Sequence, residues 1–154
     1  MKDDLTGDEL VRASKDNVLI ETLQAGMLGL PKVVEPKYSV ENEATGVVIE
    51  ILHPGVLFLT KLKRWYVSRE SDFPKTVLKV ASDRSDLEYL VYWLAEHGMT
   101  IEFEKYEGKT KEQLHVYVKT FKEVCGENEA LMGALQRAMK VEDWHAITGC
   151  GDSK

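Results

Sequence analysis

Apolar residues recur at helical spacing through most of the C-terminal two thirds of the chain. In residues 54–69, Phe58, Leu62 and Trp65 fall at i, i+4 and i+7, so they share one face of a helix. Pro54 suits the first turn of such a helix, where its missing N–H costs nothing. The spacing therefore predicts a helix over 54–69.

Two capping boxes mark further helix starts, each a hydroxyl residue followed three positions later by Glu or Gln. Ser85 and Glu88 form the first box and predict a helix that ends at Gly98. Thr110 and Gln113 form the second box. The helix that it opens would bury Leu114, Val118 and Phe121.

The helical spacing of apolar residues weakens toward the C-terminus. Residues 127–140 carry Leu131, Leu135 and Met139 at helical spacing and predict a final helix. Residues 142–154 have little pattern and are expected to form a tail.

Strand signals are fewer than helix signals. Residues 46–52, Gly-Val-Val-Ile-Glu-Ile-Leu, are rich in β-branched side chains and predict a strand. Residues 14–30 fit either a helix or a short strand over 18–20. Several helices with one or two strands predict an α-rich α+β fold, whose sheet is too small to be stable alone.

This pattern also suggests how the chain is organised. We expect a partial sheet region over 1–53, a helical region over 54–141 and the tail, all within one compact domain. A chain of 154 residues suits a single domain of this kind.

Composition removes several classes of protein. Apolar residues make up 44% of the chain and charged residues 30%, which is typical of a globular domain. The longest aliphatic or aromatic run, Val56–Leu59, is far shorter than a membrane-spanning helix, and the acidic N-terminus lacks a secretory signal. With only two cysteines, the sequence predicts a cytoplasmic protein without a disulfide framework or a membrane partner.

Charge is unevenly distributed around a net value of −6. Residues 61–85, called the basic segment below, carry seven basic and three acidic side chains, a net charge of +4. Such a segment is either a local anion site or simply a solvated basic face. Its candidate phosphate ligands are Lys61, Lys63, Arg64 and Arg69.

Two carboxylates ahead of the basic segment are candidate metal ligands. Glu50 alternates with apolar residues in the predicted strand, and Asp16 follows Lys15. A solvent-facing Glu50 is the simpler interpretation of this alternation. If Asp16 and Glu50 lay on adjacent strands, however, they could hold Mg²⁺ through oxygen ligands, and Lys61 could clamp a phosphate beside it.

Several stretches of the chain resemble the nucleotidyltransferase superfamily, in particular its AbiEii-like and related fungal branch. The similarity covers roughly residues 12–125 and is strongest over 53–109. It is carried by the helix His53-Pro54-Gly55-Val56-Leu57-Phe58-Leu59-Thr60-Lys61-Leu62-Lys63-Arg64-Trp65, by the run Ser82-Asp83-Arg84-Ser85-Asp86-Leu87-Glu88-Tyr89-Leu90, and by Trp93-Leu94-Ala95-Glu96.

The resemblance implies magnesium-dependent transfer of a nucleotidyl group from a nucleoside triphosphate to an acceptor that it does not identify, whether RNA or protein. Asp16 and Glu50 match metal ligands, and Lys61 matches a catalytic, phosphate-binding cation. Asp83 and Asp86 match downstream aspartates of the family, which would orient Lys61 and the basic side chains near it. In the simpler interpretation, the two aspartates only place negative charge at the N-terminus of a helix, where it is stabilising.

The chain departs from the family pattern in two ways. Val18 stands where the family has its second aspartate, and nothing before residue 12 resembles the first strand and glycine-bearing helix. Losing one oxygen ligand weakens the metal site, so the sequence predicts little or no transfer activity. The alternatives are a non-catalytic module that binds a nucleotide, RNA or protein, and a helical interaction domain.

Overall fold

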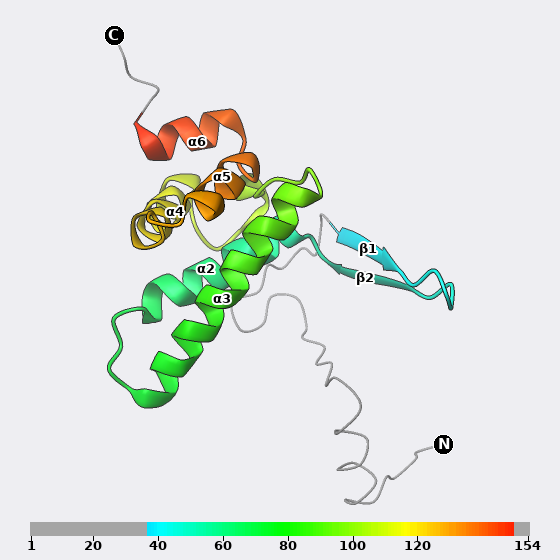
Figure 1. The fold of residues 1–154 in the computed structure, drawn as a ribbon, viewed down its shortest axis with the longest axis horizontal. Helices are drawn as coiled ribbons and strands as arrows, with labels where there is room; N and C mark the ends of the chain where they lie inside the picture. Colours follow the sequence, from blue (N-terminus) through cyan, green and yellow to red (C-terminus); the bar gives the residue numbers. More distant parts are fainter. Residues whose placement is uncertain (1–36, 150–154) are drawn as a thin grey trace, which may run out of the picture.

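A computed structural model describes residues 37–149 of the chain, which form a helical body with a β-hairpin projecting from it (Figure 1). The described part is therefore helix-rich with a small antiparallel sheet, as an α-rich α+β fold requires. Its elements in chain order are β1 (Lys37–Glu41), β2 (Val48–Leu52), α2 (Pro54–Ser68), α3 (Pro74–Glu96), the short 3₁₀ helix η1 (Phe103–Lys105), α4 (Lys111–Val124), α5 (Glu129–Arg137) and α6 (Val141–Thr148).

Side-chain hydrogen bonds in the turn stabilise the hairpin. The side-chain oxygen of Asn42 accepts hydrogen bonds from the backbone N–H groups of Ala44 and Thr45, at 3.0 and 3.2 Å. Gly46 has a φ of 70°, a left-handed conformation that favours glycine. The resulting register pairs Val40 with Ile49. The predicted strand over 46–52 is thus confirmed, whereas its partner β1 was not predicted.

Helix α2 confirms the prediction over 54–69, and its first turn has an unusual cap. His53 Nδ1 accepts a hydrogen bond from the backbone N–H of Gly55 at 3.0 Å. This bond satisfies one of the N–H groups that a helix leaves without a partner at its start. Burial lowers the pKa of His53, and the nearby Glu102 partly opposes that shift.

This cap predicts a loss of stability in mild acid. Because the pKa of His53 is lower in the folded chain, the unfolded chain binds the proton more readily once the pH falls below about 6.5. Protonation of Nδ1 also removes the acceptor for Gly55. Between pH 7 and pH 5 we expect the wild type to lose more free energy of unfolding than His53→Asn, whose amide caps without titrating; loss of a helix cap alone costs about 1 kcal/mol. Urea titrations of both chains at the two pH values measure this difference in the free energy of unfolding. Equal losses in the two chains would refute the prediction.

Helix α3 begins at Pro74, and the predicted start at Ser85 is wrong. Pro74 occupies the first turn, and no glycine or proline interrupts the chain before Gly98. Ser85 therefore lies in the middle of the helix on its exposed side, where it caps nothing. The predicted end is confirmed, because α3 stops at Glu96, just before Gly98 with its φ of 62°.

The second capping box is present as predicted. The Thr110 hydroxyl accepts from the backbone N–H of Gln113, whose side chain accepts from the backbone N–H of Thr110. Leu114, Val118 and Phe121 of α4 are all buried, as the spacing predicted.

The segment predicted as one helix over 127–140 ends earlier than expected. Asn128 caps α5 through a hydrogen bond from Leu131 N–H, and the helix stops at Arg137. A further helix, α6, occupies Val141–Thr148, where a tail was predicted. Only eight residues long, α6 shows too little periodicity to be recognised, yet Asp143 and Ile147 are buried.

The core lies between α2, α4 and the helices that cover them. Phe121 of α4 meets the rings of Phe58 and Trp65 edge to face, at centroid distances of 6.2 and 5.6 Å. Edge-to-face contacts are a favoured arrangement of aromatic side chains. Within residues 37–149, no helix combines the length and apolarity needed to cross a membrane.

Candidate functional site

The basic segment is built on α2 and α3, which pack side by side. Lys61 of α2 points to Asp86 of α3, and the two form an ion pair with 2.8 Å between Nζ and Oδ2. The exposed fractions of the two side chains are 25% and 47%, so solvent reaches both partners. A carboxylate thus already neutralises the predicted catalytic cation.

Arg64 is paired in the same way, one helical turn further along α2. Its Nε donates to Asp83 Oδ2 at 2.7 Å, and its Nη2 donates to Asp83 Oδ1. Asp83 is 2% exposed, and the hydrogen bond with it raises the pKa of Arg64. A two-point bond to a buried carboxylate fixes the guanidinium, so Asp83 and Arg64 tie α3 to α2.

The structure therefore brings four of the predicted site residues together, as Lys61 with Asp86 and Arg64 with Asp83. Their spacing explains the pairing, since the two cations are three apart on α2 and the two carboxylates are three apart on α3. The same contacts serve helix packing, so a phosphate ligand would have to compete with both carboxylates.

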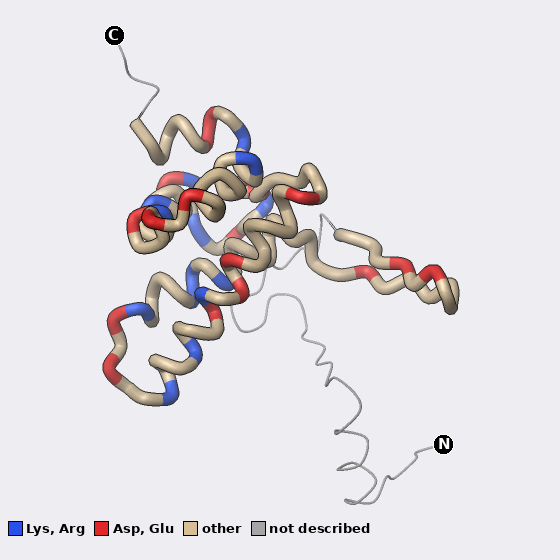
Figure 2. Tube along the Cα trace, viewed as in Figure 1, with Lys and Arg blue, Asp and Glu red and all other residues tan. Residues whose placement is uncertain are grey.

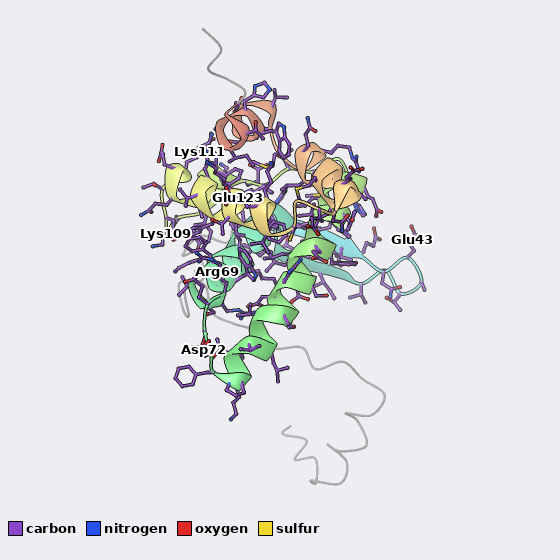
Figure 3. The ribbon with its side chains drawn as sticks, turned by 60° about the vertical axis from the view of Figure 1, so that its left-hand side comes forward. Glu43, Arg69, Asp72, Lys109, Lys111 and Glu123 are labelled. Carbon is purple, nitrogen blue, oxygen red and sulfur yellow. The ribbon has the colours of Figure 1, made fainter. Side chains whose placement is uncertain are left out.

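Arg69 lies at the end of α2, near the α2–α3 loop that also carries Asp72 (Figure 3). Its guanidinium stands 4.0 Å from the centre of the Tyr66 ring, and its Nη2 lies 3.8 Å from a carboxylate oxygen of Glu70. Tyr66 in turn stacks on Tyr117 of α4 at 4.1 Å. Arg69 thus covers an aromatic stack. Lys63, the fourth predicted phosphate ligand, is partly buried on α2.

Of the two predicted metal ligands, Glu50 lies within the described residues and Asp16 does not. Glu50 is exposed in β2, opposite Ser39 of β1. Asp16 and Val18 lie outside the described residues, so the meeting of Asp16 with Glu50 stays a prediction. Among residues 37–149, no three His, Cys, Asp or Glu side chains gather as a metal site would require.

Sequence reasoning missed the apolar face of the hairpin. Because side chains alternate along a strand, Tyr38 and Val40 of β1 share one face with Ile49 and Ile51 of β2. Tyr38 contacts Trp93 of α3 edge to face at 5.4 Å, which anchors the base of the hairpin. The alternation of Tyr38 and Val40, followed by a turn at Asn42, was the available signal for β1.

A second missed cluster joins α4 to α6. Asp143 is 2% exposed, and its Oδ1 lies 3.0 Å from both Lys111 Nζ and His115 Nε2. The hydrogen bond to Asp143 raises the pKa of Lys111. Because Lys111 and His115 of α4 both bind Asp143 of α6, the cluster is explained by the docking of α6.

Comparisons of the chain with protein-family models, with curated proteins and with solved structures found no match. The nucleotidyltransferase likeness therefore stays a prediction from sequence.

Proposed function

We propose that the chain is a non-catalytic, nucleotidyltransferase-like module that binds a polypeptide segment on the apolar face of its β1–β2 hairpin. The observation that carries this proposal is the exposure of that face. Val40, Ile49 and Ile51 all project from the same side of the sheet, and they are 45%, 53% and 39% exposed. Contiguous exposed apolar side chains are typical of protein-interaction sites.

The position of the hairpin supports this role. Figures 1 and 3 show the hairpin extending away from the helices, with Glu43 at its tip. A two-stranded sheet is only marginally stable by itself, and a sheet normally buries one face against another layer. The base of the face contacts Trp93 of α3 through Tyr38, whereas Val40 and Ile49 further out are about half exposed and so accessible to a partner.

Charge indicates the chemistry of the partner. Residues 37–52 contain one basic and three acidic residues, a net charge of −2. An acidic hairpin repels RNA and nucleotides, and it favours an apolar peptide flanked by lysine or arginine. A polypeptide partner therefore suits this surface better than RNA or a nucleotide does.

The basic segment supports the loss of catalysis. Lys61 and Arg64, the cations best placed to clamp a triphosphate, are bound to Asp86 and Asp83. Val18 also replaces a metal-binding carboxylate of the family pattern. We therefore propose that magnesium-dependent transfer has been lost, while the helical scaffold has been kept.

Selection from a random 12-residue peptide library displayed on phage tests the proposed function. We expect enriched peptides to combine Val, Ile, Leu or aromatic residues with Lys or Arg. Their affinity should fall about tenfold for the chain carrying Ile49→Thr and Ile51→Thr, since two apolar contacts are lost while strand propensity is kept.

Val48→Thr is the matched control, because Val48 is 56% exposed on the opposite face of β2. This variant should bind the selected peptides as the wild type does. A library that yields no enriched peptides, or peptides that bind both hairpin variants equally well, would overturn the proposal.

A further inference from the structure

Helix α3 carries a second apolar surface, on the side that faces away from the core. Its members recur at intervals of three and four residues and so lie on one stripe of the helix. Leu78 is 73% exposed and Tyr89 67% exposed. We call this surface the outer stripe; it consists of the exposed residues Leu78, Ala81, Ser85, Tyr89 and Glu96, and of Tyr92, which is half-buried because it also packs against the core.

The outer stripe is not needed for the core of the described part. Leu87, Leu90 and Leu94 bury the opposite side of α3, together with the ion-paired Asp83. Surface helices usually place polar residues on their outward side, so large exposed apolar residues there call for a partner.

The order of residues along the outer stripe is self-complementary. If two copies of α3 lie antiparallel with Ser85 at their midpoint, residue 81 of one copy faces residue 89 of the other, and residue 78 faces residue 92. Small Ala81 then meets large Tyr89, and Leu78 meets Tyr92. The small Ser85 side chains let the two helices approach closely at the two-fold axis.

Charge complementarity favours the same arrangement. Lys75 lies at the start of α3 and Glu96 at its end, and both are exposed. Figure 2 shows blue at the end of α3 next to the α2–α3 loop and red at the opposite end. Antiparallel helices bring Lys75 of one copy level with Glu96 of the other, whereas parallel helices would bring like charges together.

We infer that the outer stripe binds the outer stripe of a second copy of this chain, giving a symmetric dimer of antiparallel α3 helices. Such an isologous interface uses the same surface patch on both subunits. The inference is independent of the proposed function, because the hairpin face is not part of the outer stripe. The Ile49→Thr and Ile51→Thr chain should dimerise like the wild type.

Analytical ultracentrifugation of three chains tests the inference. The wild type should show a concentration-dependent dimer. Lys75→Glu alone and Glu96→Lys alone should each weaken it about tenfold, since two attractive ion pairs become repulsive in each dimer. An equimolar mixture of the two variants should restore dimerisation, because each then meets its opposite charge. A monomeric wild type, or two variants that dimerise as the wild type does, would overturn the inference.

Oxidative cross-linking tests the position of the two-fold axis. In a Cys150→Ser background, Ser85→Cys should form a disulfide-linked dimer rapidly, since both thiols lie at the axis. Glu123→Cys, an exposed position on α4, is the matched control and should cross-link slowly. Equal rates for the two variants would contradict the antiparallel arrangement.

Discussion

Phe121→Ala is expected to lower the free energy of unfolding by about 3–5 kcal/mol, the usual cost of truncating a buried aromatic side chain. Phe121 is fully buried, and it contacts the rings of both Phe58 and Trp65. Its loss leaves a cavity between α2 and α4 that neither ring can fill without leaving its own contacts.

Urea titration followed by circular dichroism measures this effect. Val116→Ala is the matched control, since Val116 lies on the same helix and is 51% exposed. It should change the free energy of unfolding by no more than about 0.5 kcal/mol. A loss below about 1 kcal/mol for Phe121→Ala would mean that α2 and α4 do not pack as described.

Gly55→Ala should be the second most damaging change, at about 3 kcal/mol, the upper part of the range for overpacking. A Cβ atom at position 55 would lie 2.3 Å from the backbone oxygen of Thr100. The backbone around Thr100 would have to move away, which would strain the hydrogen bond from Glu102 N–H to Gly55 O and the neighbouring one from Ile101 N–H to Ala138 O.

Gly133→Ala provides the comparison for thermal or urea unfolding. Gly133 lies within α5, where an added Cβ would meet nothing closer than an Arg137 nitrogen at 3.6 Å. Alanine favours helix more than glycine does, so this change should be neutral or stabilising by up to about 1 kcal/mol. If both glycine variants proved equally stable, the close approach of residues 55 and 100 would be wrong.

Local signals in the sequence predicted the elements that depend on them. Helix α2, the capping box of α4 and strand β2 each follow from residues adjacent in the chain. The start of α3 was misplaced because Ser85 and Glu88 match a capping box in sequence while lying inside a longer helix. Whether a serine caps depends on its backbone conformation, which the residue pattern alone does not determine.

The elements that were missed depend on contacts between distant residues. Helix α6 is short, and it is held by Asp143, which binds Lys111 and His115 of α4. Strand β1 takes its register from β2 and its anchor from Trp93.

The candidate site was likewise predicted only in part, because some of its features depend on contacts between distant residues. The charge of the basic segment singled out Lys61 and Arg64, and the family resemblance singled out Asp83 and Asp86, but neither showed that each cation binds one carboxylate. Which groups neutralise a cation depends on the packing of α2 against α3. The exposed apolar face of the hairpin likewise depends on the strand register, which pairs Val40 with Ile49.

Two NMR titrations of the ¹⁵N-labelled chain, one with a library-selected peptide and one with magnesium and ATP, distinguish a peptide-binding module from a nucleotidyltransferase. We expect the peptide to shift the backbone amides of 38–52, and we expect magnesium and ATP to leave Lys61, Arg64 and Glu50 unshifted. Shifts of these three residues by magnesium and ATP, together with transfer of labelled nucleotide that Glu50→Ala abolishes, would contradict this expectation and restore the catalytic function.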